Sequence, residues 1–216
     1  MSKKVGVLLA GCGVYDGSEI HEAVLALLAL DRAGAEVLIT APNRDQAHVI
    51  NHLTGEVTTE TRNVLVEAAR IARGKITDLA DVHADQMDAL VLPGGFGAAK
   101  NLCNFAFEGT NMGVDPEVTR IVGEMREANK PIGFICISPT IAAKLIPGVT
   151  LTMGAACDAT EAAEAMGAVH VVTDVAGAVV DAEHKVVTTG AYMMGPWVKD
   201  VAAGIDNLVG EVLALA

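Results

Sequence analysis

The sequence predicts an α/β fold in which an open, mostly parallel sheet is covered by helices on both faces. Apolar runs of strand length alternate with segments whose apolar residues recur at helical spacing, the order expected of parallel strand-helix-strand units. Apolar residues make up 51% of the 216 residues and aromatic residues only 3%. Small aliphatic side chains must therefore build the core, as closely packed helix and sheet layers require. We expect one domain over residues 1–216.

The first strand-helix-strand unit is expected at residues 5–41. The apolar run 5–10 predicts a strand, and a polar, glycine-containing loop leads from it into a helix that Gly34 ends. Residues 36–41 (EVLITA) predict the next strand. Because such parallel crossovers are almost always right-handed, we expect that hand here.

The middle of the chain has a less regular pattern. A polar stretch at 42–61 precedes a predicted helix at 62–74, and residues 75–87 are expected to be irregular. DALVLP, residues 88–93, predicts a short buried strand. It runs into GGFGAAKNL, where glycines allow backbone conformations closed to other residues, and we expect a loop at 94–101.

The second half returns to alternating elements. Asp115-Pro116 predicts a helix start by its cap and first-turn proline, followed by one apolar face. A strand at 131–136 feeds a helix whose first turn carries Pro139. The remaining predicted elements are a strand at 149–153, a short helix at 160–167, a hairpin at 178–190 and a helix at 197–216.

Charge and cysteine usage exclude several classes of protein. The formal charge of −12 argues against nucleic-acid or anionic-membrane partners, which need clustered Lys and Arg. No window offers the roughly 20 uninterrupted apolar residues of a spanning helix, so we expect a soluble protein. The four cysteines show neither Cys-x-x-Cys pairing nor metal-ligand spacing, which favours a reducing cytoplasm and no metal site.

Three loops gather at the carboxyl ends of the predicted strands, where open α/β sheets bind ligands: 11–21, 94–101 and 136–140. Cys136 lies between a strand end and a helix start. The N–H groups and positive dipole end of that helix are expected to lower its thiol pKa and favour thiolate. A buried packing residue is the other interpretation of a cysteine at this place.

Two further features accompany this cysteine. The backbone N–H groups at Gly94-Gly95, with that of Ile137, could bind a developing oxyanion, although a glycine pair can also be a simple turn. Glu19, His21 and Glu22 lie within one turn at the start of the first helix, and a carboxylate there could move a proton to and from sulfur or a bound aldehyde, although an acid such as Glu22 also complements the helix dipole.

Several residues have a weaker claim to the site. Cys12 and Asn63 could line it, as a second oxidisable thiol and as a polar wall, but turn packing for Cys12 and helix capping for Asn63 are the favoured interpretations. Met193, Met194 and Trp197 are expected in the core or at a dimer interface. GCGVYDG fails the dinucleotide fingerprint at Asp16, and no nucleotide is expected.

Five segments carry a resemblance to a known family: GCGVYDGSEIHEAV, RNVLVEAARIARGKITDLA, LPGGFGAAKNL, PIGFICISP and DAEHKVVTTGAYM. Together they resemble the ElbB-type glyoxalases, also called isoprenoid-biosynthesis proteins, of the PfpI-like, class I glutamine amidotransferase-like superfamily. The resemblance implies a flavodoxin-like fold, a homodimer and a cofactor-free conversion of glyoxal to glycolate. By motif it places the nucleophile at Cys136, the acid at Glu22 and the oxyanion-binding glycine at Gly95.

The sequence departs from the superfamily pattern at one place that bears on the reaction. Many superfamily members have a histidine after the strand that follows the cysteine, whereas this chain reads GAACDAT after VTLTM. Protease or glutamine amidotransferase chemistry through a Cys-His pair is therefore disfavoured. A small dicarbonyl or aldehyde is the expected substrate, and the alternative is a regulatory protein in which Cys136 senses aldehydes or oxidants.

Overall fold

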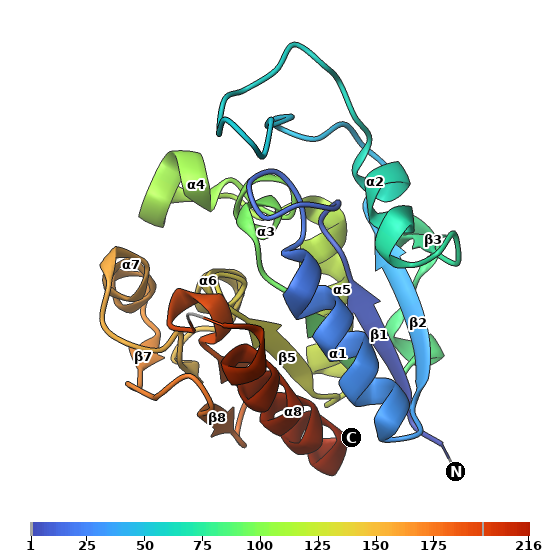
Figure 1. Ribbon diagram of the computed structural model, residues 1–216. Helices are drawn as coiled ribbons and strands as arrows, with labels where there is room; N and C mark the ends of the chain where they lie inside the picture. Colours follow the sequence, from blue (N-terminus) through green and yellow to red (C-terminus); the bar gives the residue numbers. More distant parts are fainter. Residues whose placement is uncertain (1, 196) are drawn as a thin grey trace.

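The computed structural model describes residues 2–195 and 197–216, and its centre is a seven-stranded sheet of order β3-β2-β1-β4-β5-β9-β8. Its strands are parallel except β8, which runs antiparallel to β9 (Figure 1). The strands span β1 Lys4–Leu8, β2 Glu36–Ala41, β3 Thr77–Asp78, β4 Ala89–Leu92, β5 Ile132–Ile135, β8 Ala178–Asp181 and β9 Val186–Thr189.

Helices cover both faces of this sheet, as predicted. Val5 and Val7 of β1 pack into one buried cluster with residues of α1 (Ile20–Arg32), α2 (Val64–Ile71) and α8 (Val198–Leu215). Leu8 points to the other face, in a second cluster with residues of α5 (Pro116–Glu127) and α6 (Pro139–Leu145). The alternation along one strand follows from the two-residue period of β structure. The flavodoxin-like α/β fold is confirmed.

Several elements agree closely with their sequence patterns. β2 has the predicted bounds, and β8 and β9 form the predicted hairpin. Asp115 caps α5 through its side chain, with Pro116 in the first turn. The predicted apolar face of α5 is buried: Val118, Ile121, Val122 and Met125.

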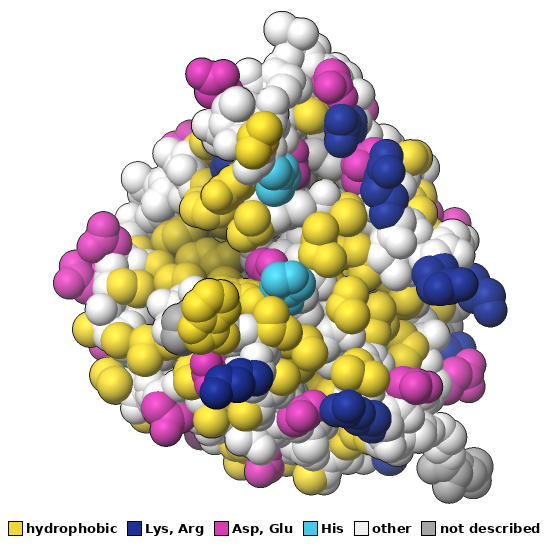
Figure 2. Space-filling view, viewed as in Figure 1, with side chains coloured by type: hydrophobic (Ala, Val, Ile, Leu, Met, Phe, Trp, Pro, Cys, Tyr) yellow, Lys and Arg dark blue, Asp and Glu magenta, His cyan; other side chains and the backbone are white. Residues whose placement is uncertain are grey.

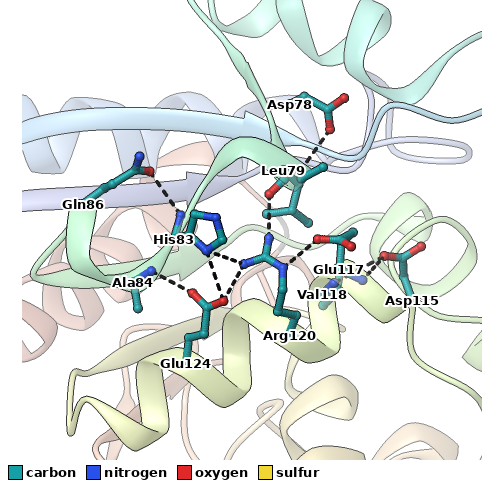
Figure 3. Close-up of polar contacts among 11 residues, drawn as sticks. Asp78, Leu79, His83, Ala84, Gln86, Asp115, Glu117, Val118, Arg120 and Glu124 are labelled. Atoms are coloured by element: carbon teal, nitrogen blue, oxygen red, sulfur yellow. Dashed lines mark hydrogen bonds and ion pairs between the residues drawn. The ribbon is translucent and has the colours of Figure 1, made fainter.

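The segment 75–87, expected to be irregular, contains an edge strand. β3 pairs with β2 for two residues, and 3₁₀ turns at Leu79–Asp81 and Ala84–Gln86 follow. Two residues are too few for a sequence period, so β3 could not be read from the pattern. Arg120 of α5 holds this segment by donating to the Leu79 carbonyl (2.8 Å) and to Glu124 (2.8 Å), as Figure 3 shows.

The prediction of a loop at 94–101 is largely wrong, because Phe96–Lys100 form the short helix α3. A helix is possible here because Gly97 lies directly against the backbone of Gly17, an approach that a Cβ would block. A second short helix, α4 (Phe105–Glu108), follows and has no counterpart in the predicted elements.

The strand predicted at 149–153 exists but lies outside the main sheet. β6 (Thr150–Leu151) pairs in parallel with β7 (Val169–His170), which was not predicted. Between them lies α7 (Asp158–Ala165), close to the predicted helix. This small βαβ unit packs at the β8 and β9 side of the main sheet, where the Thr150 N–H donates to Asp181 and the Thr152 N–H to the Thr188 hydroxyl.

Candidate active site

Cys136 lies on a sharp turn between β5 and α6, in the left-handed region of backbone conformation (φ 64°). A non-glycine residue seldom adopts this conformation, and it persists only where the surroundings enforce it. Here the buried Ser138 hydroxyl donates to the Leu92 carbonyl of β4 (2.8 Å) and accepts the Ile135 N–H (2.8 Å). The Cys136 N–H donates to Thr189 of β9 (2.9 Å). Bonds to both neighbouring strands thus hold the turn.

The glycine pair after β4 lies against this turn. A Cβ at Gly94 would be 2.8 Å from Glu22 Oε2 and would also collide with Cys136. Gly95 has φ 93°, and a Cβ added there would collide with the backbone of Glu19. Side chains are therefore excluded at both positions, and the N–H groups of Gly95 and Ile137 are directed at the Cys136 sulfur.

Glu22 is completely buried, and its carboxyl group lies beside the Cys136 thiol, both against Gly94. The Gly94 N–H donates to its Oε2 (2.9 Å) and the Tyr192 N–H to its Oε1 (3.3 Å). Burial, and then the nearby Glu19 charge, raise the Glu22 pKa to about 8. Glu22 is therefore protonated at neutral pH.

The lowered thiol pKa expected for Cys136 is wrong. Burial raises the pKa of this thiol well above its ordinary value, and the Glu22 carboxyl group raises it further. The Gly95 and Ile137 N–H groups do act in the expected direction, because they stabilise the thiolate, but they are outweighed.

Two further residues contribute to the site, and of these Tyr192 was missed. Glu19, named with Glu22 as a candidate carboxylate, caps α1 by accepting the Glu22 N–H (2.7 Å) and lines the pocket. Tyr192 follows β9 and also lines the pocket, and its hydroxyl bonds to His21 Nδ1 (2.8 Å). Tyr192 comes soon after the predicted hairpin at 178–190, and its place beyond a strand end is the one sequence signal that marks it.

A pocket of about 250 Å³ opens above the sulfur. Between α4 and the start of α8, Figure 2 shows a hollow lined with hydrophobic side chains. Apart from the carboxylate of Glu19, the pocket walls are mainly apolar. The lining residues are Val14, Glu19, Gly95, Phe96, Cys136, Ile137, Tyr192 and Met193.

Three sequence expectations about the lining need correction. Asn63 is not among the lining residues, because its side chain caps α2 by accepting the Val66 N–H (3.0 Å). Cys12 is half-buried near Glu67 and Arg70 and is also outside the lining. Met193, assigned to core or interface, lines the pocket as well as packing on the core.

The region of the superfamily histidine is filled by a different side chain. Gly154 adopts φ 95°, and a Cβ there would collide with the Met194 side chain. Met194 Sδ accepts the Ala155 N–H (2.9 Å). None of the described residues that line the pocket is a histidine, so a Cys-His pair is not formed at its surface.

Comparison with known proteins places this geometry in a family. A model of the DJ-1/PfpI family matches residues 3–194. The chain belongs to the DJ-1/PfpI family. The family resemblance drawn from the sequence motifs is thereby confirmed.

Relatives within and around the DJ-1/PfpI family match nearly the whole chain. The human "Glutamine amidotransferase-like class 1 domain-containing protein 3, mitochondrial" is 49% identical over 98% of this chain and 83% of its own. The crystal structure of an isoprenoid biosynthesis protein with amidotransferase-like domain from Ehrlichia chaffeensis has a TM-score of 0.92 and 39% identity, and covers 99% of this chain and 100% of its own. Drosophila melanogaster DJ-1beta, 21% identical with a TM-score of 0.59, covers 100% of this chain and 96% of its own and shares the fold.

The rat relative, "ES1 protein homolog, mitochondrial", is also 49% identical over 98% of this chain and 84% of its own. Because the human and rat names both specify mitochondria, the cytoplasmic location expected from the cysteines stays a prediction. In residues 2–195 and 197–216, no helix is both long and apolar enough to cross a bilayer.

Proposed function

We propose that the protein is a glutathione-independent glyoxalase that converts glyoxal to glycolate through Cys136. One observation carries this proposal: the Cys136 sulfur contacts a protonated carboxyl group and faces two backbone N–H groups at the base of a small pocket. The DJ-1/PfpI family includes cysteine-based glyoxalases and deglycases, which supports a carbonyl substrate.

The reaction begins with addition of sulfur to one carbonyl carbon of glyoxal, which forms a hemithioacetal. In the reactive form the sulfur is a thiolate beside protonated Glu22, so the new oxyanion first accepts hydrogen bonds from the Gly95 and Ile137 N–H groups and then takes the Glu22 proton, which leaves Glu22 ionised. Both donors are fixed backbone groups, so little reorganisation accompanies the appearance of charge.

Glu22, now ionised, removes the proton from the carbon bound to sulfur. An enediol forms, and Glu22 returns the proton to the second carbon. The product is a glycolyl thioester on Cys136. Water then attacks the thioester carbon, and the C–S bond breaks to release glycolate and the thiol. One glyoxal and one water give one glycolic acid, with no net oxidation or reduction.

The described residues that line the pocket include no histidine, which favours a second candidate, an aldehyde or oxidant sensor with little turnover. The raised pKa keeps most of the Cys136 thiol protonated at neutral pH, and because the thiolate is the nucleophile, turnover would be slow. In such a protein the adduct on Cys136, and not a released product, would be the signal.

Purified protein incubated with glyoxal and no added cofactor tests the proposal. Glycolate is measured over many turnovers, and mass spectrometry locates any adduct. We expect steady glycolate formation that Cys136→Ser abolishes and Cys12→Ala leaves within about twofold, because Cys12 lies outside the pocket lining. One glycolate per chain or fewer, with a stable adduct on Cys136, would establish the sensor instead.

A further inference from the structure

A second pocket, of about 390 Å³, lies beside the thiol pocket and shares the Phe96 side chain with it. Its lining comes from three parts of the chain: Tyr15 of the first loop, Ile50 and Gly55 of the long segment between β2 and α2, and Phe96 and Lys100 of α3. In Figure 1 that long segment extends over the α3 end of the molecule. Phe96 therefore separates two adjoining compartments.

The long segment is fixed over this second pocket by specific bonds. The Ile50 N–H donates to the buried carboxylate of Asp16 (2.6 Å). The Tyr15 N–H donates to His52 Nε2 (3.2 Å), and the Tyr15 and His52 rings lie 4.9 Å apart. The second pocket is thus a built feature of the fold.

Lys100 provides the one positive charge among the described residues that line this pocket. Its Nζ donates to the Tyr15 carbonyl (3.0 Å) and lies 5.2 Å from the Phe96 ring centroid. These contacts fix the ammonium group beside the wall that the two pockets share. An ammonium group has three N–H donors, so two remain for a ligand.

The described hydrogen bond of Lys100 is to a carbonyl oxygen and not to a carboxylate, as is also the case for Lys130 and Lys185. Arg44, Arg62 and Arg70, in contrast, each pair with a carboxylate at hydrogen-bond distance. Partial burial without such a partner lowers the Lys100 pKa, although the Asp16 charge acts in the other direction. A bound anion would supply the missing charge.

We propose that Lys100 forms an anion subsite, and that the protein accepts carbonyl compounds carrying a carboxylate, with the carbonyl end above Cys136 and the carboxylate at Lys100. This inference rests on the proposed function for the identity of the reacting end. A carboxylate fits better than a phosphate, because a single ammonium group near Asp16, in a chain of net charge −12, balances one negative charge and not two.

Ligand protection tests the subsite without requiring turnover. 4-Oxopentanoate and its uncharged methyl ester are compared for their ability to slow iodoacetamide alkylation of Cys136, followed by mass spectrometry. We expect the acid to protect at about tenfold lower concentration than the ester, as one added ion pair of about 1.4 kcal/mol would produce. Lys100→Gln should abolish this preference, whereas Lys100→Arg and the exposed control Lys144→Gln should retain it.

Turnover supplies an independent measurement with 4,5-dioxopentanoate, which joins a glyoxal-like end to a carboxylate. Lys100→Gln should lower kcat/KM for this compound about tenfold through KM and leave kcat/KM for glyoxal unchanged. Equal protection by acid and ester, or a preference that survives Lys100→Gln, would overturn the subsite. Stronger protection by dihydroxyacetone phosphate would overturn the carboxylate assignment. Charge-selective protection without turnover would leave the subsite standing and refute the glyoxalase reaction.

Discussion

Glu22 has no exposed surface and its carboxyl group lies beside the Cys136 thiol, so the pair resists carrying two negative charges. Burial raises the pKa of both groups, and each negative charge opposes the other. The N–H groups of Gly95 and Ile137 favour the form in which sulfur carries the charge. The reactive form of the site therefore has thiolate beside a protonated Glu22.

Glu22→Gln tests this arrangement at the sulfur. The amide keeps a hydrogen-bond donor against Cys136 and removes the like charge, so we expect the thiol pKa to fall and iodoacetamide alkylation to begin at lower pH. Glycolate formation should nevertheless be lost, by at least about 100-fold, because general acid-base groups contribute on this scale. Alkylation rate against pH is the measurement. Glu67→Gln, which changes another buried acid outside the pocket lining, is the control. An alkylation profile that is unchanged in Glu22→Gln would show that the Glu22 carboxyl group does not raise the thiol pKa.

The same raised pKa predicts a pH dependence of stability. Folded Glu22 keeps its proton up to about pH 8, whereas the unfolded chain loses it near 4.5. Between these values the native state binds more protons, so the free energy of unfolding falls as pH rises, by about 1.4 kcal/mol per pH unit for a fully coupled group. Urea unfolding across this range should show a flatter dependence in Glu22→Gln. Parallel curves for the two proteins would mean that Glu22 ionises normally in the fold.

The residues of the site differ in how far the sequence could identify them. Cys136, Glu22 and Gly95 were reached from their places at strand ends and a helix start, and the structure brings them into contact. The direction of the thiol pKa was wrong because burial and a neighbouring acid are tertiary properties, and a strand-to-helix turn shows only the backbone contribution. Tyr192 reaches Glu22 through its main-chain N–H, which no side-chain pattern marks.

At the scale of elements, the turn between β5 and α6 depends on one buried hydroxyl. Ser138→Ala removes the donor to the Leu92 carbonyl and the acceptor of the Ile135 N–H. Leaving such buried groups without partners costs about 1–3 kcal/mol, which we expect to see as a loss in the free energy of unfolding. Ser2→Ala, which removes an exposed hydroxyl bonded to Gly34, should change stability by less than about 0.5 kcal/mol. Equal effects of the two substitutions would show that Ser138 does not hold the turn.

A second element-scale prediction concerns the polar cluster that joins α5 to residues 79–86 (Figure 3). Burial alone would raise the pKa of Glu124, but hydrogen bonds from Arg120, the Ala84 N–H and His83 lower it. Because the folded pKa is depressed, Glu124 adds stability above its unfolded pKa and loses that contribution as pH falls. Glu124→Gln should therefore cost about 1 kcal/mol at neutral pH and little in acid.

Denaturant unfolding at several pH values measures this effect. Glu127→Gln, an exposed acid at the end of the same helix, is the control for removing a charge from α5. A Glu124→Gln cost that stays constant into the acid range would assign the effect to packing and not to ionisation.

Elements with a long period were predictable, whereas those made by a few tertiary bonds were not. α5 shows its cap, its first-turn proline and four apolar residues of one face, all local signals. β3 and β7 have two residues each and exist because a neighbouring strand offers a partner. α3 begins at a glycine pair that resembles a loop, and only the approach of Gly97 to Gly17 reveals why a helix can start there.

At the scale of the whole molecule, one helix face remains without a described partner. On α1, Ile20, Val24 and Leu28 are 42%, 48% and 38% exposed, although they share helical spacing. Trp197 and Val198, at the start of the neighbouring α8, are exposed too. Figure 2 shows hydrophobic side chains gathered on this face. A helix stripe with this composition is expected to be covered by another surface.

The homodimer that the sequence resemblance implies would supply such a surface, since a self-complementary patch is the usual basis of a two-fold dimer. We predict that Val24→Glu, which places a charge in the middle of the α1 face, converts a dimer into monomers. Light scattering after size exclusion should give twice the chain mass for the parent protein and one chain mass for the variant. Val172→Glu, which adds the same charge at an exposed valine on another segment, should leave the mass unchanged.

The α1 face begins beside Glu19 and Glu22, so a dimer formed there would also restrict motion at the pocket. The monomeric variant should therefore show a faster rate of Cys136 alkylation. A parent protein that is monomeric at every concentration would refute the dimer and leave the apolar face to a different partner.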